Sequence, residues 1–236
     1  MNARVALVGG DEFRVGCEEM DRGILKTIGK SPPRVLVLPT AAASQNPVKS
    51  ASNGVSYFRG LGAEASSLMV LGKDEANDSD FLAPINTTDL IYFAGGSPRH
   101  LLYTLSNSLL MEQLKTAAEG SAILAGSSAG AMVLGPWMHL RKWSKALGII
   151  HGVAVMPHHE RTNPDDITHE LMCSAPHGLT VLGIDAMTCC FGGPEKWSVI
   201  GSGSVTVYEG ERWSKHGPGE LFTTPAATTS QEENKG

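Results

Sequence analysis

Residues 122–135 read AILAGSSAGAMVLG, and the rest of the chain can be placed relative to this stretch. A short apolar run ends at Gly126, and a small-residue segment with helical potential begins after Ser128. The pattern predicts a buried strand that turns sharply into a helix at Ser128. Residues 126–130 fit G-x-S-x-G, in which small neighbours relieve a cramped backbone and the serine hydroxyl is exposed. Ser128 is therefore the candidate nucleophile.

The helix expected after Ser128 would allow this turn to stabilise a negative charge. The first N–H groups of a helix lack acceptors within it, and here they would point toward the serine. The amide of Ala129 is then placed to receive an oxyanion. A turn rich in Gly, Ser and Ala can also serve only for tight packing or for holding an anion. The pentapeptide alone leaves these two interpretations open.

The composition is that of a globular protein with one domain. The 236 residues include 42% hydrophobic and 18% charged residues, and no segment reads as a linker. We expect a single domain over residues 1–224 and a flexible polar tail over residues 225–236. The net charge of −5 gives no basic surface for nucleic acid or acidic membranes. A small molecule or peptide is the expected partner.

Targeting signals and cysteines indicate the compartment. Residues 1–10, MNARVALVGG, lead directly into a strand pattern without the apolar core of a signal peptide. No apolar run approaches the ~18 residues that a membrane span needs. The four cysteines lack C-x-x-C spacing, which is typical of reduced thiols. We expect a cytoplasmic protein that makes no membrane contact.

Short apolar runs alternate with helical patterns along the first half of the chain. This alternation predicts a fold of the α/β class, a mostly parallel sheet with helices on both faces. Residues 151–156 and 179–184 are expected to add strands to the same sheet. From Trp197 onward, glycine turns separate alternating segments, which predicts antiparallel hairpins near the C-terminus. The parallel strands are expected at residues 5–8, 34–38, 67–71, 90–93 and 121–125, with helical stretches over 17–28 and 101–114.

Ligands of such sheets bind at the carboxyl ends of the strands. Four of these ends carry glycine, proline or hydroxyl residues and are expected to converge on one cleft. The pair Gly95 and Gly96 is the informative one, because glycine amides can approach a reacting carbonyl and supply a second oxyanion donor. A tight turn between strand and helix explains the same pair equally well. The four strand ends are residues 9–10, 39–40, 95–96 and 126–128.

Histidine is the usual base for a serine hydroxyl, because its pKa lies near the working pH. His158 and His159 stand out among eight histidines, because they follow an apolar run that is expected in the same sheet as Ser128. A zinc site that combines them with His169 and His177 is the competing interpretation. It is the weaker one, because no H-E-x-x-H occurs and adjacent side chains on an extended segment point in opposite directions.

A carboxylate is expected to hold the base in the correct tautomer. Asp185 follows the apolar run LTVLGI and is the only acid at a strand end after the histidines. It is therefore the candidate acid. Solvent exposure in a loop or helix explains the other acids of this region, which are Glu160, Asp165, Asp166 and Glu170.

Four motifs occur in order: FAGG at 93–96, GSSAGA at 126–131, MPHHE at 156–160 and GID at 183–185. Together they resemble the peptidase E and cyanophycinase family of serine peptidases, and the likeness covers nearly the whole chain. The resemblance implies a flavodoxin-like, class I glutamine amidotransferase-like fold that uses no cofactor and no metal. It also implies that Ser128 is the nucleophile, that His158 is the base, and that the amides of Gly96 and Ala129 form the oxyanion hole.

The chain departs from the family pattern in two places. Members commonly carry G-I-D-E-x-T, whose glutamate serves the histidine, whereas Ala186 stands at that position here. A polar residue such as Gln or Asn usually follows the paired glycines and holds substrate, whereas residues 97–99 here read SPR. Substrate contacts are expected from Gly95, Ser97, His159, Arg99 and Arg161, with an arginine as the ligand of a substrate carboxylate.

The leading hypothesis is a serine peptidase-like hydrolase that cleaves a small peptide or isopeptide bond, such as that of an aspartyl peptide. The alternative is a catalytically silent binding module, because Ala186 removes the acid of the family's triad. An α/β-hydrolase shares G-x-S-x-G, with Asp165 or Asp166 preceding His177 or His216. Aliphatic residues in the C-terminal hairpins offer a surface through which a homodimer could form.

Overall fold

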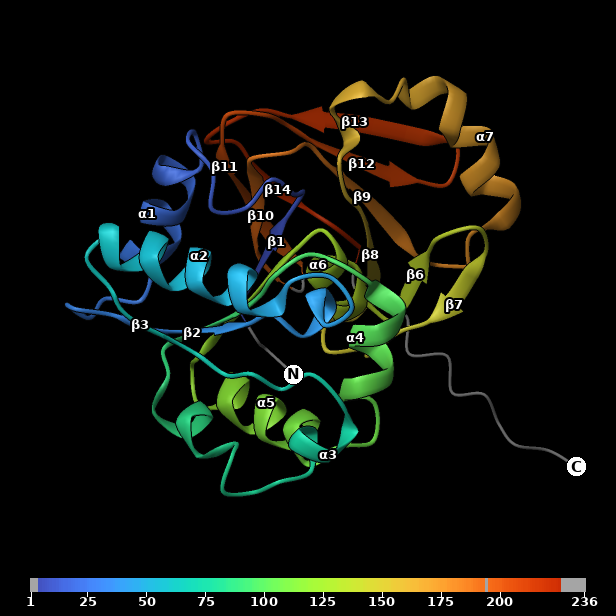
Figure 1. The fold of residues 1–236 in the computed structure, drawn as a ribbon. Coiled ribbons are helices and arrows are strands. Elements are labelled where there is room, and N and C mark those ends of the chain that lie inside the picture. The colour runs from blue at the N-terminus through green and yellow to red at the C-terminus, as the bar shows by residue number, and fades with distance from the viewer. Residues whose placement is uncertain (1–3, 194, 226–236) are drawn as a thin grey trace, which may run out of the picture.

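The computed structural model describes residues 4–193 and 195–225, and an eight-stranded sheet forms its centre (Figure 1). Strands β1, β5, β4, β2 and β3 pair in parallel, and β10, β11 and β14 continue the sheet antiparallel from β1. The mostly parallel α/β sheet predicted from the sequence is confirmed. In spatial order the strands are β14 (Leu221–Thr223), β11 (Lys196–Gly201), β10 (Thr188–Gly192), β1 (Val5–Val8), β5 (Ile123–Ser127), β4 (Leu90–Phe93), β2 (Arg34–Leu38) and β3 (Glu64–Ser67).

A second, four-stranded sheet corrects the expectation that residues 151–156 and 179–184 join the sheet of Ser128. These segments form β8 (Val153–Met156) and β9 (Thr180–Ile184), which pair in parallel with each other, and β12 and β13 extend this sheet. The physical reason lies at β1, whose free edge is taken by β10, a strand that the sequence analysis missed. The remaining strands are β12 (Val205–Glu209), β13 (Arg212–His216) and the hairpin β6 (Trp137–His139) and β7 (Trp143–Lys145).

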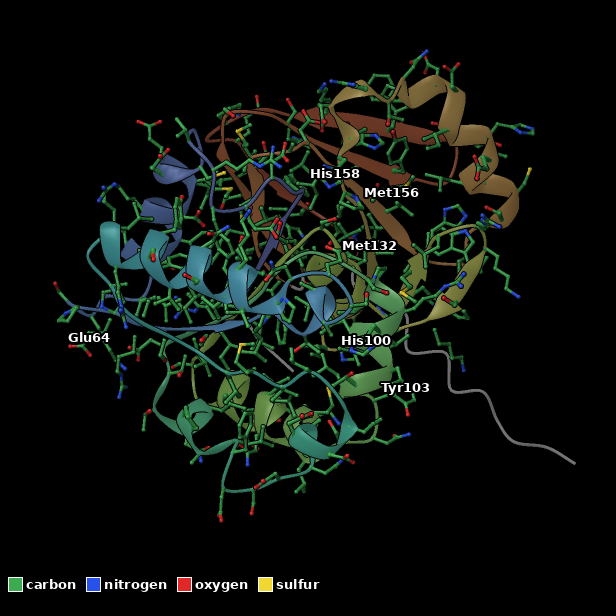
Figure 2. The ribbon with its side chains drawn as sticks, viewed as in Figure 1. Glu64, His100, Tyr103, Met132, Met156 and His158 are labelled. Carbon is green, nitrogen blue, oxygen red and sulfur yellow. The ribbon has the colours of Figure 1, made fainter. Side chains whose placement is uncertain are left out.

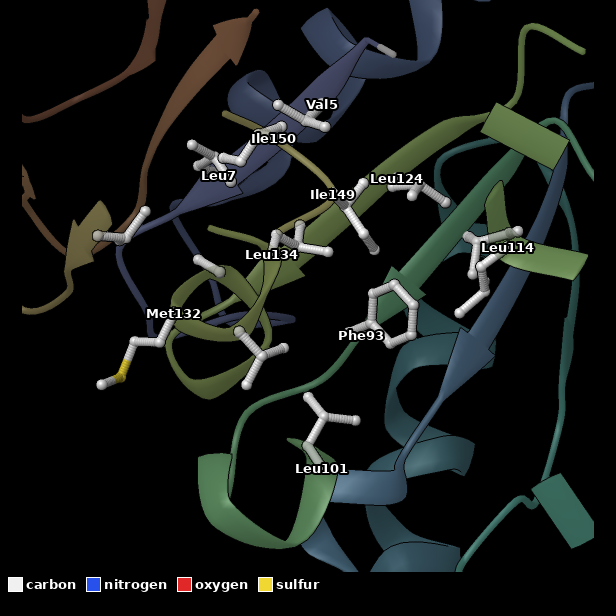
Figure 3. Packing of buried hydrophobic residues seen from close by; sticks show 14 of the residues in the cluster. Val5, Leu7, Phe93, Leu101, Leu114, Leu124, Met132, Leu134, Ile149 and Ile150 are labelled. Atoms are coloured by element: carbon white, nitrogen blue, oxygen red, sulfur yellow. The ribbon is translucent and has the colours of Figure 1, made fainter. Parts of the chain in front are cut away.

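Helices cover both faces of the large sheet because its strands are apolar on both sides. Along β1, Ala6 and Val8 pack in one hydrophobic cluster with residues of α1 and α2. Val5 and Leu7 pack on the opposite face with residues of α4, α5 and α6 (Figure 3). This alternation is the period of two that a strand imposes. The helices are α1 (Glu18–Lys26), α2 (Pro47–Gly60), α3 (Lys73–Ala76), α4 (Pro98–Leu105), α5 (Leu109–Glu119), α6 (Ala129–Leu134) and α7 (Pro164–Ser174).

The strand expected at 67–71 and the helical stretch expected over 101–114 differ from the sequence predictions for local reasons. The strand expected at 67–71 lies at Glu64–Ser67, because it is a sheet edge with exposed polar residues rather than a buried apolar run. The helical stretch over 101–114, which the sequence pattern predicts as broken, forms two helices, α4 and α5. Asn107 has a left-handed φ of 52°, and the Ser108 side chain caps α5 by accepting the Met111 N–H at 3.2 Å.

The antiparallel hairpins predicted near the C-terminus are confirmed, although they divide between the two sheets. β11 pairs with β10 and β14 in the large sheet, whereas β12 and β13 form a hairpin in the small one. Apart from Pro225, the predicted tail over 225–236 lies outside the described residues. The single-domain organisation stays a prediction. None of the described helices combines the length and apolar character needed to cross a bilayer.

A buried carboxyl group lies on the inner face of α1. Asp21 is 1% exposed, and its Oδ2 accepts a hydrogen bond from the Tyr57 hydroxyl at 2.7 Å. Burial raises the pKa of Asp21 to about 7, although the Tyr57 hydrogen bond opposes the rise. Among the described residues, Asp21 Oδ1 and the Tyr92 hydroxyl have no hydrogen-bond partner. Ionised Asp21 is therefore costly for the folded state.

We expect Asp21→Asn to stabilise the protein at alkaline pH. Between about pH 4 and pH 7 the folded state binds more protons at Asp21 than the unfolded state, so stability falls as the pH rises through this window. An Asn side chain still accepts the Tyr57 hydroxyl but cannot ionise. Urea unfolding at pH 8 should show a gain of up to about 4 kcal/mol over the wild type.

The matched control is Glu19→Gln, which removes an exposed carboxylate from the same helix. Its pH profile of the free energy of unfolding should follow that of the wild type. Parallel pH profiles for the wild type and Asp21→Asn would contradict the account of a buried ionisable Asp21.

Candidate active site

Ser128 occupies the strained turn between β5 and α6. β5 ends at Ser127, α6 begins at Ala129, and Ser128 between them has φ 48° and ψ −107°. A positive φ is uncommon for a residue with a Cβ and persists only where the surroundings enforce it. Two backbone hydrogen bonds do so here: the Ser128 N–H donates to Val8 O at 2.9 Å, and the Met132 N–H donates to Ser128 O at 3.0 Å. The predicted position of Ser128 at a strand-to-helix turn is confirmed.

His158 reaches Ser128 from the other sheet. It lies just beyond β8, near Met156 (Figure 2), and it adopts a left-handed conformation with φ 54° and ψ 46°. Its N–H donates to Gly9 O at 2.8 Å, which ties this loop to the end of β1. The imidazole Nε2 lies 3.3 Å from Ser128 Oγ. The structure thus brings Ser128 and His158 together, although they belong to different sheets.

The backbone amides of Gly96 and Ala129 have no hydrogen-bond acceptor among the described residues. Gly96 has φ 142°, and a Cβ at this position would lie 2.3 Å from Ala41 O, so only glycine fits the turn. Ala129 is the first residue of α6, where helix N–H groups lack an intrahelical acceptor. In the described part of the chain, neither amide donates a hydrogen bond.

An open cleft of about 450 Å³ contains most of the candidate groups, although Ala129, which is 2% exposed, is not among its described lining residues. Gly95, Gly96, Ser128 and His158 lie among its lining residues. The strand ends at 95–96 and 126–128 therefore meet as predicted, and Gly10 contributes the surface against which the His158 ring lies. The strand end at 39–40 is not part of the described cleft lining. The Thr40 hydroxyl is buried and donates to Val70 O at 2.7 Å. The rest of the described lining includes Asp11, Glu12, Phe13, Arg14, Asn46, Lys49 and Asn53.

Several expected substrate contacts do not lie in the cleft. His159 is 3% exposed and its Nε2 lies 2.7 Å from the Tyr208 hydroxyl, so its ring points into the small sheet. Its burial also lowers its pKa. The Ser97 hydroxyl instead caps α4 by accepting the His100 N–H at 3.3 Å. Arg99 and Arg161 are exposed, and the described lining of the cleft includes neither of them.

Asp185 has partners other than the candidate base. It is 7% exposed, and its Oδ2 accepts the Ser204 N–H at 2.9 Å. Within the described residues no hydrogen bond joins Asp185 to His158. Its role as the acid stays a prediction.

Glu160 is a candidate that the sequence analysis assigned to solvent. It lies two residues after His158 in the short 3-10 helix His159–Arg161, and its Oε2 accepts the Ala186 N–H at 2.9 Å. This hydrogen bond lowers the pKa of Glu160. The carboxylate of Glu160 therefore lies against the residue where the family pattern has glutamate. Its spacing from His158 was the only signal for it in the sequence.

Glu12 is a second acidic residue that the sequence analysis did not single out. It follows Gly9 and Gly10 in the loop between β1 and α1. Its Oε1 accepts the Gly95 N–H and its Oε2 accepts the Ser127 hydroxyl, both at 2.7 Å. No local motif marks it, because its partners come from strands far along the chain.

The arrangement of these groups is that of a particular class of protein. A serine on a strained turn, an imidazole within reach of its hydroxyl and two unbonded amides are the parts of a serine hydrolase site. The α/β-hydrolase order is wrong for this chain, because His158 rather than His177 or His216 lies at Ser128, and His216 Nδ1 lies 3.4 Å from Glu220. Among the described residues, no group of three or more His, Cys, Asp or Glu side chains is arranged to hold a metal ion.

Comparisons with known proteins place the chain within this class. Residues 6–191 match peptidase family S51. A cyanophycinase of Geminocystis herdmanii is 27% identical, covering 94% of this chain and 86% of its own length. A cyanophycinase of Trichormus variabilis is 27% identical, covering 87% of this chain and 73% of its own length.

Solved structures agree with these matches. A peptidase from an acI-B1 Actinobacterium superposes with a TM-score of 0.82 at 28% identity, covering 95% of this chain and 98% of that one. A putative peptidase E protein from Listeria monocytogenes EGD-e, with a TM-score of 0.57 at 15% identity over 91% of this chain and 98% of that one, shares the fold. The chain belongs to peptidase family S51 and is a serine-type peptidase hydrolase.

Gly10→Ala is expected to separate His158 from Ser128. A Cβ at Gly10 would lie 2.1 Å from His158 Cε1, so the ring must move away. A positioned base raises the rate of a reaction by about 10²–10⁴-fold. The second-order rate constant for inactivation by diisopropyl fluorophosphate should therefore fall by roughly 10- to 100-fold. Gly29→Ala is the control, because Gly29 also has a positive φ, 72°, but has open space around its Cβ position. Equal inactivation rates for the two variants would contradict this description of the His158 site.

Proposed function

We propose that the protein hydrolyses a small peptide or isopeptide bond with Ser128 as nucleophile and His158 as base. The observation that carries the proposal is the 3.3 Å approach of His158 Nε2 to Ser128 Oγ at a strained turn. His158 takes the hydroxyl proton as Oγ attacks the carbonyl carbon, and the amides of Gly96 and Ala129 bind the resulting oxyanion. His158 then protonates the leaving amine, and water releases the acyl group from Ser128 by the reverse sequence.

We infer that the substrate carries a carboxylate, as an aspartyl peptide does. The match to peptidase family S51 and to cyanophycinases supports a peptide substrate. Arg14 and Lys49 are the cations of the described cleft lining, which also includes Asp11 and Glu12, and Arg14 pairs with Asp11 at 3.3 Å. Lys49 lies in the first turn of α2, where the helix dipole also favours an anion. These two residues take over the role that the sequence analysis gave to Arg99 and Arg161. A single polypeptide chain supplies all of these groups, and a homodimer stays a prediction.

Hydrolysis of α- and β-linked aspartyl dipeptides tests the proposed nucleophile. The wild type is expected to release free amino acids, whereas Ser128→Ala should lose activity by at least about 10⁴-fold because no other hydroxyl replaces Oγ. Ser66→Ala, on the exposed edge strand β3, is the control and should retain full activity. Turnover that persists in Ser128→Ala would overturn the proposal. A folded wild type that cleaves no member of the panel would favour the silent binding module.

We assign the role of the missing triad acid to Glu160. Two observations support this choice over Asp185. The Glu160 carboxylate contacts the amide of Ala186, the residue where the family pattern has glutamate, and Glu160 follows His158 by two residues. As for Asp185, no hydrogen bond among the described residues joins Glu160 to His158. The Asp185 carboxylate is instead bonded to the Ser204 amide, and its charge acts on the buried His159. Because Glu160 is exposed, solvent weakens its effect on His158, so its contribution should be smaller than that of a buried acid.

Glu160→Gln and Asp185→Asn distinguish the two carboxylates. Glu160→Gln is expected to lower kcat by roughly 10- to 100-fold with little change in KM, because the imidazolium formed in the reaction loses its counter-charge. Asp185→Asn should change kcat by less than about threefold, although it removes a charged acceptor from a buried turn and lowers stability. The reverse pattern would restore Asp185 as the acid, and equal small effects would indicate a Ser-His dyad.

A further inference from the structure

Glu12 joins the two turns from which the proposed catalytic groups project. Its Oε1 accepts the N–H of Gly95, and its Oε2 accepts the hydroxyl of Ser127, each at 2.7 Å. Gly95 directly precedes Gly96, the proposed oxyanion donor, and Ser127 directly precedes Ser128, the proposed nucleophile. Both carboxylate oxygens are therefore used by neighbours of the reacting groups. In the described part of the chain, Glu12 bonds to neither Ser128 nor His158.

The backbone of the loop that carries Glu12 is fixed by its conformation and packing. Asp11 and Phe13, on either side of it, have left-handed φ values of 59° and 62°. Residues with a Cβ adopt this conformation at a cost and keep it only where packing enforces it. The Phe13 ring supplies that packing, because its centroid lies 5.1 Å from that of Tyr92 and 5.8 Å from that of Phe58. The packing of Phe13 in this aromatic cluster thus fixes the backbone that carries the Glu12 carboxylate.

We propose that Glu12 is a positioning residue that sets the distance between the Gly96 amide and Ser128 Oγ. Charged acceptors form stronger hydrogen bonds than neutral ones, so one carboxylate can clamp a backbone amide and a hydroxyl at once. An oxyanion donor is effective only when it is already aimed at the position that the oxyanion will occupy. Loss of Glu12 removes the two hydrogen bonds through which it links the turn at residues 95–96 to the turn at residues 127–128, although the pairing of β4 with β5 remains. The inference rests on the proposed function, since it assigns a supporting role to the same two groups.

Two substitutions at Glu12 separate positioning from charge. Glu12→Ala removes both hydrogen bonds, and kcat for an aspartyl dipeptide should fall by roughly 100-fold with KM nearly unchanged, as for loss of one oxyanion donor. A Gln side chain can accept the Gly95 N–H through Oε1 and donate to Ser127 Oγ through its amide. Glu12→Gln should therefore keep kcat within about fivefold of the wild type.

A substrate-independent measurement accompanies the kinetics. The rate of inactivation by diisopropyl fluorophosphate depends on Ser128 and the oxyanion amides and requires no peptide contacts. It should fall with kcat in Glu12→Ala and be restored in Glu12→Gln. Ser127→Ala removes only one of the two hydrogen bonds, so it should cause a smaller loss and should add little to Glu12→Ala in the double variant. This variant also serves if Glu12→Ala does not fold.

Glu18→Ala is the matched control. Glu18 lies close to Glu12 along the chain, and its Oε2 likewise accepts a backbone N–H, that of Gly16 at 2.7 Å, but its partner is not at the site. It should leave kcat and the inactivation rate unchanged. Three results would overturn the inference: unchanged rates in folded Glu12→Ala, an effect on KM alone, or an equal loss in Glu12→Gln. Failure of the proposed function is distinct, since Ser128→Ala would then retain the turnover of the wild type.

Discussion

The parallel register of three neighbouring strands determines the geometry of the site. β1, β5 and β4 are aligned so that Val8 lies opposite Ser127 and Phe93 lies opposite Gly126. The three strands therefore end at the same edge of the sheet. Parallel strands in an α/β fold bring the loops that follow them together at this edge. The Ser128 N–H reaches Val8 O across this edge, and the same register places the Glu12 loop beside Gly95. A shift of register would break the hydrogen bond from Ser128 to Val8 and the one from Gly95 to Glu12.

The second sheet completes this edge with a side chain that the first sheet lacks. β8 ends with the loop that carries His158, and the hydrogen bond from the His158 N–H to Gly9 O links that loop to β1. The proposed catalytic pair is thus assembled across two sheets, whereas the amides of Gly96 and Ala129 follow strands of the large sheet alone. Local strain accompanies the assembly, since Ser128 and His158 both have positive φ. The hydrogen bonds around them compensate for that strain.

The sequence predicted what local patterns determine. The strands Val5–Val8, Arg34–Leu38 and Leu90–Phe93 are where their apolar runs indicated, and Ser128 lies at the predicted turn, because small residues and apolar runs act over a few positions. Pairing between distant segments was not readable in the same way. The sheet that carries His158 was wrongly assigned, because the edge of β1 is taken by the strand Thr188–Gly192.

Side-chain direction accounts for the remaining differences. His158 and His159 are adjacent, yet one ring faces Ser128 and the other is bonded to Tyr208, a choice set by tertiary packing. Glu12 and Glu160 read as ordinary acids in the sequence because the amides that they accept come from Gly95 and Ala186, distant along the chain. Polar residues near a strand end are thus predictable as a group, whereas their individual partners depend on the three-dimensional register.

Mapping the residue that reacts with a fluorophosphonate, by mass spectrometry of the digested protein, tests the role of Ser128 most directly. We expect one adduct per chain, on the peptide that contains Ser128, and none in folded Ser128→Ala. We also expect slower labelling when His158 is replaced by Gln, because the hydroxyl then lacks its base. An adduct on any other residue, or no adduct on a folded wild-type protein, would contradict the assignment of Ser128 as the nucleophile.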